Sequence, residues 1–462
     1  MESVSVERFY LGCLAHASWM VGSGGVAAVI DPQRDVDIYL EAATSRGWKI
    51  AHIIETHVHA DFVSGHRELA ERTGASIYLG QGSGAEFPHI AVKDGDELSF
   101  GTCRMEFLQT PGHTLESICI LMHDTGDPAR PGVLFTGDTL FVGDVGRPDL
   151  SGTHTPQELA AILYRSLHDK VLRLPDETLI YPAHGAGSLC GRQMSAESSS
   201  TIGKERRTNY ALLAGTSDEF VHLLTDDLPG APEYFAQEVE LNRKGAAPVS
   251  QLPGLQAFSA TEVQQLQQGG VIVVDTRPPA EYAAAHVPGS LHIALTGQYA
   301  SWAARILGLN TRLVIVGEDE THVRESQLRL ARVGLDGVVG FLRDGISGWV
   351  RDGLELESIP QITAPDLADL CRQDPAGVTI LDVREVGELA SGSIEGSVCI
   401  PLGRLKTRTA ELDPTKLVVV HCKGGYRSSI AGSILRRAGF REIANLIGGF
   451  DAWKAAGLPI AA

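Results

Sequence analysis

Short runs of β-branched and other apolar residues alternate with segments of helical character through the second half of the chain. Residues 417–420, Leu-Val-Val-Val, have the pattern of a buried strand, whereas residues 260–268 and 428–438 have that of helices. Strands of this length between helical segments favour small α/β domains built on a parallel sheet. In the first half, residues 51–54 also predict a buried strand, but this strand leads into a polar segment that contains two histidines.

The second half contains an internal repeat. Residues 273–277 correspond to residues 380–384, because both runs are apolar strands that lead into an Asp-x-Arg turn. Each copy ends in a matching segment, with Trp349 in the first copy and Trp453 in the second. The offset between corresponding positions stays between 104 (453 − 349) and 107 (380 − 273) residues. A repeat this regular predicts two copies of one domain.

About three domains are expected in a chain of 462 residues, since a typical domain has about 150 residues. Segments with the glycine and proline content of linkers occur at residues 244–253 and 354–365. The predicted domains therefore comprise residues 1–245, 255–356 and 361–462.

Composition and charge limit the class of partner. The chain is 43% hydrophobic and 21% charged, as globular proteins are, and no apolar stretch approaches the roughly 18 residues of a membrane helix. Its net charge of −18 would repel phosphate backbones and anionic membranes. The first eight residues are partly acidic, unlike the basic start of a secretory signal. We therefore expect a cytoplasmic protein without a nucleic-acid or membrane partner.

Histidine and aspartate residues in the first half stand where apolar strands end. His57, His59 and Asp61 follow the strand at residues 51–54. Three further residues stand near glycines at the ends of later apolar runs: His113, Asp138 and His184. Backbone turns at such glycines allow ligands from distant segments to converge. The series predicts a catalytic metal site.

This series resembles the metallo-β-lactamase fold, an αββα sandwich of two sheets flanked by helices, over about residues 6–240. Phe62 is the informative departure, since binuclear hydrolases of this fold have a histidine directly after the motif aspartate. Phenylalanine cannot bind a metal, so a two-zinc hydrolytic site is disfavoured. Two imidazoles and one carboxylate with open positions suit non-haem iron(II) instead.

Three further motifs, at residues 138–147, 181–185 and 187–191, are similar to those of the persulfide dioxygenases of this fold. The resemblance implies one Fe(II) per chain and no organic cofactor, with the metal ligands His57, His113 and Asp138. It also implies that His59, Asp61 and His184 orient the ligands, and that Arg147 and Tyr181 line the site for the carrier thiol.

Cys422 follows the predicted strand at residues 417–421 and precedes a glycine-rich loop and a helix. Backbone N–H groups, the helix N-terminus and the cations Lys423 and Arg427 should favour its thiolate and stabilise a bound persulfide. The other six cysteines are scattered without a CxxC pair, so a disulfide framework is disfavoured. With the motifs at residues 382–385 and 448–453, residues 361–460 resemble the rhodanese family. The resemblance implies a nucleophilic Cys422, with Lys423 and Arg427 in the substrate-binding loop.

The middle repeat lacks this cysteine. Its matching position is Glu318, or Gly317 if the alignment shifts by one, and the loop at residues 317–322 is acidic. An acidic loop is poorly suited to an anionic persulfide. We expect a catalytically inactive repeat that serves as a spacer or a dimerisation surface.

The predicted fold is thus an αββα metallo-β-lactamase sandwich followed by two α/β rhodanese domains with parallel sheets. The predicted enzyme oxidises a low-molecular-weight thiol persulfide, such as glutathione persulfide, with O₂ to sulfite. It transfers sulfane sulfur through Cys422 to or from thiosulfate, in sulfide detoxification. A homo-oligomer, dimer or tetramer, is expected. Two alternatives stay open: a glyoxalase II-like thioester hydrolase fused to a rhodanese, and a non-catalytic persulfide carrier that docks partners.

Overall fold

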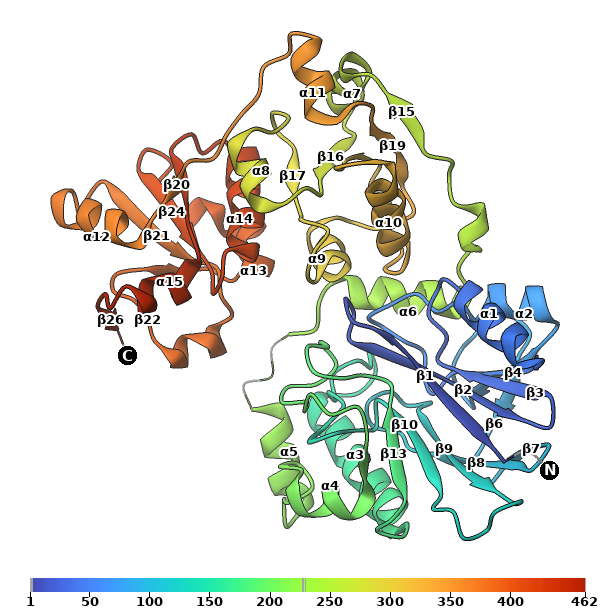
Figure 1. Ribbon diagram of the computed structural model, residues 1–462. Helices are drawn as coiled ribbons and strands as arrows, with labels where there is room; N and C mark the ends of the chain where they lie inside the picture. Colours follow the sequence, from blue (N-terminus) through green and yellow to red (C-terminus); the bar gives the residue numbers. More distant parts are fainter. Residues whose placement is uncertain (1–2, 227, 229, 462) are drawn as a thin grey trace. The chain divides into compact units, whose positions relative to one another are not determined.

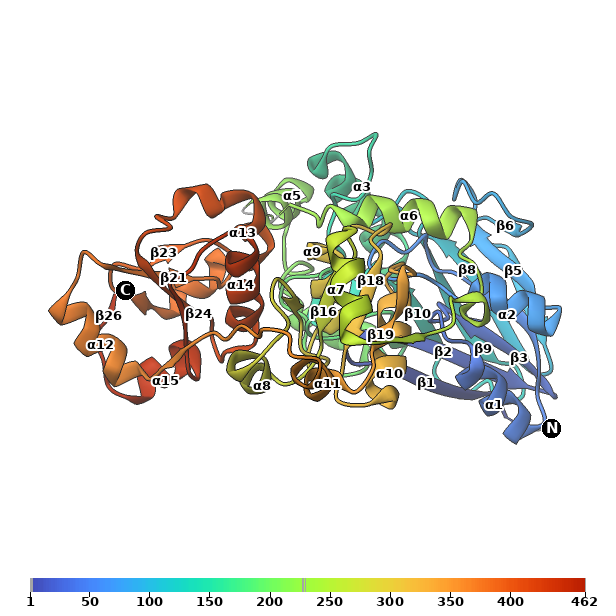
Figure 2. The ribbon, with the colours of Figure 1, turned by 90° about the horizontal axis from the view of Figure 1, so that it is seen from above.

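The computed structural model describes residues 3–226, 228 and 230–461. The chain divides into two compact units, one of Met1–Leu252 with Ala331–Gly334 and one of Pro253–Leu330 with Leu335–Ala462. Figures 1 and 2 show the elements of both units from two directions. No helix in the described ranges has the length and apolar character needed to cross a membrane.

The N-terminal unit contains two six-stranded sheets, with the strand orders β1-β2-β3-β4-β5-β6 and β14-β13-β10-β9-β8-β7. The strands of the first sheet are β1 Ser5–Leu11, β2 His16–Ser23, β3 Val26–Ile30, β4 Lys49–Ile54, β5 Ser76–Gly80 and β6 Ile90–Val92. Those of the second are β7 Glu97–Phe100, β8 Cys103–Gln109, β9 Ile118–Asp124, β10 Val133–Gly137, β13 Leu179–Pro182 and β14 Ser200–Thr201. A short hairpin, β11 Leu140–Phe141 with β12 Asp144–Val145, follows β10.

The two sheets pack face to face through a buried apolar layer that includes Trp19, Ile30, Phe107 and Phe135. The helices are α1 Asp37–Arg46, α2 His66–Thr73, α3 Pro156–Asp169, α4 Ile202–Thr208, α5 Ser217–Thr225 and α6 Tyr234–Lys244. Apolar residues of α1 and α2 pack on the outer face of the first sheet, and those of α3 to α5 on that of the second. The ribbon shows these helices on opposite sides of the paired sheets (Figure 1). This is the predicted αββα sandwich.

The C-terminal unit contains two five-stranded parallel sheets with corresponding strand orders, β15-β19-β18-β16-β17 and β20-β25-β24-β21-β23. The middle repeat comprises β15 Gln256–Phe258, α7 Ala260–Gln268, β16 Ile272–Asp275, α8 Pro279–Ala284, β17 Leu291–His292, α9 Tyr299–Ile306, β18 Leu313–Val316, α10 Glu320–Ala331, β19 Val338–Leu342 and α11 Gly345–Arg351. Equal strand order in the two copies confirms the internal repeat and the predicted α/β class.

The C-terminal repeat comprises β20 Gln361–Ile362, α12 Ala364–Gln373, β21 Val378–Asp382, β23 Val398–Cys399, α13 Leu402–Arg408, β24 Leu417–His421, α14 Tyr426–Arg437, β25 Ile443–Leu446 and α15 Gly449–Ala455. A two-stranded sheet, β22 Ser393–Ile394 with β26 Ile460–Ala461, lies beside it. Helix α14 begins two residues before the expected segment at 428, so that it starts inside the glycine-rich loop. Figure 1 shows α13 and α14 on one side of the sheet, and α12 and α15 on the other.

Helix α6 holds the loop that carries the metal motif. The side-chain amide of Asn242 donates hydrogen bonds to the carbonyl oxygens of His59 and Phe62, both at 2.8 Å, and accepts one from the backbone of Ser64 at 2.9 Å. Because the loop has no regular hydrogen bonding of its own, these bonds satisfy buried backbone groups that would otherwise be unpaired.

Glu238, one turn before Asn242 on α6, is completely buried. Neither of its carboxyl oxygens has a hydrogen-bond partner within the described ranges. Burial, and next the negative charge of Asp61, raise the pKa of Glu238 well above its ordinary value of 4.5. The side chain is therefore a neutral acid in the folded protein near neutral pH.

We predict that Glu238→Gln gains stability relative to the wild type as the pH rises. Above the ordinary pKa the unfolded wild type releases a proton that the folded state retains, so its free energy of unfolding falls by up to about 1.4 kcal/mol per pH unit. Glutamine has no such proton. Urea unfolding of both proteins between about pH 5 and pH 7, at equal metal content, measures the difference. If the free energies of unfolding of the two proteins changed in parallel with pH, Glu238 would ionise normally, and the prediction would be wrong.

Candidate metal centre and sulfur-transfer site

Loops at the strand ends bring His57, His113 and Asp138 together. His57 follows β4, His113 lies between β8 and β9, and Asp138 follows β10 directly. One ligand atom from each of the three lies within 4.8 Å of the other two, and all three residues are buried. The Nε2 atoms of His57 and His113 lie 3.8 and 3.4 Å from Oδ2 of Asp138.

Hydrogen bonds on the far side of each ring determine which nitrogen of these histidines is free to bind a metal. Nδ1 of His113 donates to the backbone carbonyl of Arg147 at 2.9 Å. The hydroxyl of Thr56 donates to Asp31, so Nδ1 of His57, 3.0 Å away, must donate to that hydroxyl. Both Nε2 atoms then carry lone pairs directed toward Asp138, as metal ligation requires.

The three inward-facing atoms, Nε2 of His57, Nε2 of His113 and Oδ2 of Asp138, have no hydrogen-bond partner among the residues that the structure describes. Buried polar atoms without partners are costly, and three that converge fit a cation. Burial, and next the charge of His59, lower the pKa of His57 well below 6.5, which keeps it neutral. Burial alone would raise the pKa of Asp138, but the charge and hydrogen bond of His184 hold it well below its usual value. The donor set therefore fits one divalent metal ion.

His184 is held between two carboxylates. Its Nδ1 lies 2.7 Å from Oδ1 of Asp138 and its Nε2 lies 2.9 Å from Oδ2 of Asp61. Although burial would lower the pKa of His184, the two carboxylates raise it well above 6.5, so the ring is a buried imidazolium. Cys190 lies close to Asp61 and His184. Burial, with the nearby carboxylates, raises the pKa of its thiol well above the ordinary value, which keeps it protonated.

His59 is turned toward a different acidic pair. Its Nε2 lies 3.1 Å from Oδ1 of Asp31 and 3.1 Å from Oε2 of Glu55. Against the effect of burial, these carboxylates raise the pKa of His59 to about 10. Phe62 is fully buried, and its ring lies tilted beside that of His59, with 4.4 Å between the ring centroids.

Asp31 and Glu55 were not identified from the sequence. Each is an acidic residue at the end of a buried apolar strand, β3 or β4, which is a weak pattern by itself. Asp31 also has a positive φ of 51°. Such a backbone conformation is uncommon for a residue other than glycine and frequently marks a functional position.

The two residues predicted to line the carrier-thiol site lie in well-packed surroundings. The guanidinium of Arg147 pairs with both carboxyl oxygens of Asp149 at 2.6 and 2.7 Å, and its backbone carbonyl orients His113. Tyr181 is half-buried and stacks on Trp19 with 4.3 Å between ring centroids. Each side chain therefore has a structural partner.

Cys422 stands at the end of β24, in a loop that leads into α14. Its Sγ accepts a hydrogen bond from the backbone N–H of Gly425 at 3.1 Å and lies 3.7 Å from Oγ of Ser428. Gly449 supports this loop from behind, since a Cβ there would lie 2.4 Å from the Cys422 carbonyl oxygen. The loop therefore presents the sulfur to backbone donors at a helix N-terminus, as the sequence predicts.

A pocket of about 460 Å³ opens at Cys422, Lys423 and Arg427. Lys423 is exposed. Arg427 is held by Glu388 through two contacts of 2.5 and 2.8 Å. Lys423 is thus the cation beside Cys422 that can approach an anionic substrate most freely, whereas Arg427 also fixes the loop.

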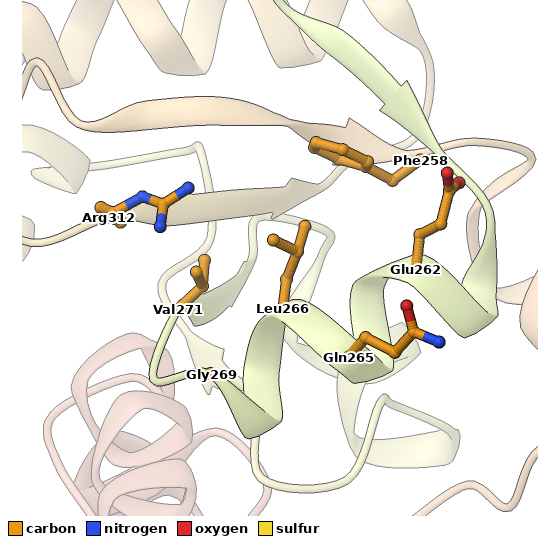
Figure 3. A pocket seen from close by; sticks show the side chains of 7 residues that line it. All are labelled: Phe258, Glu262, Gln265, Leu266, Gly269, Val271 and Arg312. Atoms are coloured by element: carbon orange, nitrogen blue, oxygen red, sulfur yellow. The ribbon is translucent and has the colours of Figure 1, made fainter.

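The corresponding loop of the middle repeat, after β18, carries acidic groups in place of the thiol. His322 pairs there with Glu318 at 3.2 Å and with Asp319 at 2.9 Å. A separate cavity of about 290 Å³ in this repeat is lined mainly by apolar groups, with Glu262 and Arg312 at opposite ends (Figure 3). Because Glu262 is engaged in capping the N-terminus of α7, we assign no catalytic role to this cavity.

Comparisons with known proteins agree with this architecture. Residues 11–184 match the family model of the metallo-beta-lactamase superfamily, and residues 259–352 and 363–456 match that of the rhodanese-like domain. A crystal structure of a metallo-beta-lactamase from Staphylococcus aureus subsp. aureus COL is similar, with 31% identity and a TM-score of 0.68. The similarity covers 74% of this chain and 99% of that one.

Two kinds of enzyme resemble the N-terminal part. The persulfide dioxygenase ETHE1 of Bos taurus is 32% identical, over 43% of this chain and 70% of that protein. The hydroxyacylglutathione hydrolase of Polaromonas sp. is 37% identical, over 39% of this chain and 66% of that enzyme. For other hydroxyacylglutathione hydrolases the matched share of the relative falls to 57%.

The chain belongs to the metallo-beta-lactamase superfamily. Its N-terminal domain is homologous to the persulfide dioxygenase ETHE1, and two tandem rhodanese-like domains follow it. The predicted family and fold class are confirmed.

We predict that Gly146→Ala weakens metal binding by about 10- to 100-fold, the usual effect of disturbing groups that orient metal ligands. A Cβ at Gly146 would lie 2.0 Å from the Asp138 carbonyl oxygen and 2.9 Å from Nδ1 of His113, so both ligands must move. Gly152→Ala is the matched control, because a Cβ there has no neighbour within 4 Å. Metal titration of both apo-proteins measures the effect, and equal affinities would contradict the assigned ligands.

Proposed function

We propose that the chain is a persulfide dioxygenase fused to a sulfurtransferase. The observation that carries this proposal is the buried set of three converging ligand atoms, with a histidine rather than an open site between two carboxylates. His57, His113 and Asp138 offer three converging ligand atoms, while the imidazolium of His184 stands between Asp61 and Asp138. The imidazolium of His184 compensates one of the two negative charges of these carboxylates, and Phe62 offers no ligand for a second metal.

The metal would be one Fe(II) per chain. Bound by two imidazoles and a carboxylate, it would supply open positions for the persulfide sulfur and O₂ and would mediate the transfer of electrons from the sulfur to O₂. The overall reaction converts R-S-SH, O₂ and water into R-SH and sulfite with two protons.

The protein's own residues hold this centre in place and control its charge. Thr56 and the carbonyl of Arg147 fix the ring orientations of His57 and His113. The charged ring of His184 keeps Asp138 ionised as a ligand. His59, Asp61 and His184 thereby act on the ligands from outside the coordination sphere. By the resemblance, Arg147 and Tyr181 would line the site for the carrier thiol.

In the C-terminal repeat, the Cys422 thiolate attacks the sulfane sulfur of thiosulfate or of a persulfide. The S–S bond of the donor breaks, and its electron pair leaves with sulfite or with R-S⁻. The backbone N–H of Gly425 and the ammonium of Lys423 then stabilise the Cys422 persulfide. Transfer to sulfite or to a thiol reverses the same steps. Both sites lie on one chain, which raises the effective concentration of the shared persulfide.

A second candidate function is thioester hydrolysis, which the identity to hydroxyacylglutathione hydrolases favours. That reaction needs a metal-activated water and no oxygen. Phe62 and the fused Cys422 domain speak against it.

We predict that two substitutions separate the two activities. His113→Ala should lose at least about 100-fold of the oxygen uptake with glutathione persulfide, because a metal ligand is gone, and should still transfer sulfur from thiosulfate to cyanide. Cys422→Ser should show the opposite pattern, since it loses the nucleophile alone. An oxygen electrode and thiocyanate assays measure both. Full oxygen uptake in His113→Ala would contradict the proposed centre.

A further inference from the structure

The pocket at Cys422 is lined by both repeats of the C-terminal unit. Cys422, Lys423, Arg427 and Asp451 lie on the C-terminal repeat. The rest of the wall comes from the repeat that lacks a cysteine, through residues 297–298 and Trp302 of α9. The middle repeat has no counterpart of Cys422, so its contribution to this wall must have a role other than sulfur transfer.

Specific polar contacts fix the two repeats against each other at this wall. The hydroxyl of Tyr426, at the start of α14, donates to the carbonyl of Ala294 at 3.0 Å. Nε2 of His292 donates to a backbone carbonyl, which leaves its Nδ1 to accept a hydrogen bond from Ser429 at 2.8 Å. Burial lowers the pKa of His292 to about 4, in agreement with this neutral form. The helix that follows Cys422 is thus anchored directly to the middle repeat.

Further contacts lie on either side of this anchor. The guanidinium of Arg437, at the other end of α14, donates to the carbonyl of Gly289 at 2.7 Å. Arg305 of α9 lies over the ring of Trp302, with 4.9 Å to the centroid, and its guanidinium lies 3.7 Å from Glu385. The indole of Trp302 is therefore positioned by α9 beside the reactive loop.

The size of the pocket indicates what it holds. Cavities of roughly 300–1,000 Å³ accommodate organic molecules, and about 460 Å³ is far more than thiosulfate, sulfite or cyanide needs. Trp302 lines this pocket with the small part of its surface that is exposed, 5%. Aromatic surface offers contact to an organic group and little to a small inorganic anion. The cation that can bind an anionic sulfur donor, Lys423, lies on the other wall, which the C-terminal repeat forms.

We propose that the cysteine-free repeat recognises the organic part of the thiol that receives sulfur from Cys422, with Trp302 as the specificity-determining residue. This inference rests on the proposed sulfurtransferase function. The step itself is balanced: the acceptor thiolate attacks the outer sulfur of the Cys422 persulfide and forms a new S–S bond. The bond between Sγ of Cys422 and the outer sulfur breaks, and its electron pair returns to Sγ, which becomes a thiolate again.

The test compares two acceptors in the full-length protein, with thiosulfate as donor. Glutathione is the organic acceptor and cyanide the small one. We expect Trp302→Ala to lower kcat/KM for glutathione by about tenfold or more, mainly through KM, and to change kcat/KM for cyanide by less than about twofold. Trp302→Phe should fall between the wild type and Trp302→Ala.

Trp349→Phe is the matched control, because it removes a buried indole from the same repeat at a position outside the pocket. This variant should leave the ratio of kcat/KM for glutathione to kcat/KM for cyanide unchanged. An equal loss with both acceptors in Trp302→Ala would make its role merely structural, and no loss with either acceptor would exclude recognition by this wall. Either result overturns the inference while the sulfurtransferase function stands. A wild type that transfers sulfur to neither acceptor would overturn both.

Discussion

Three lone pairs buried between the strand ends of the N-terminal unit are the constraint on which the rest of this domain depends. Nε2 of His57, Nε2 of His113 and Oδ2 of Asp138 converge without a hydrogen-bond partner in the described part of the chain. Such an arrangement is unfavourable unless a cation binds there. Two rigid sheets, a packed apolar layer and helix α6 fix the loops that carry these atoms, so the cost of convergence is met during folding.

Charge balance around this group supports the mononuclear centre that we propose. Four buried carboxylates lie in and around the candidate centre: the proposed ligand Asp138, and Asp31, Glu55 and Asp61. Two imidazolium rings, His59 and His184, compensate them through contacts of 2.7–3.1 Å. In the proposed mononuclear centre, the protonated His184 supplies positive charge between Asp61 and Asp138. The same surroundings keep Cys190 and Glu238 neutral, which limits the negative charge near the metal ligands.

Much of this could be predicted from the sequence, because strand-end histidines and an internal repeat are local patterns. The αββα fold, the rhodanese repeats and a metal site among the strand-end histidines and aspartates follow from the motifs along the chain, and the choice of His57, His113 and Asp138 follows from the resemblance to persulfide dioxygenases. Asp31, one of the two partners of His59, could not be found in this way, since it comes from another strand. The pairing of Arg427 with Glu388, 39 residues earlier, could not be predicted either. The same holds for the wall that Trp302 adds to the Cys422 pocket. Those contacts depend on side-chain packing between distant segments, which periodicity does not encode.

Metal exchange combined with two substrates tests the central claim most directly. The apo-protein is loaded with Fe(II) or Zn(II), and each form receives glutathione persulfide or a glutathione thioester. The mononuclear account predicts that the Fe(II) form consumes one O₂ for each sulfite produced from the persulfide, and that neither form hydrolyses the thioester efficiently. Rapid thioester hydrolysis by the Zn(II) form, with no oxygen uptake by the Fe(II) form, would contradict it.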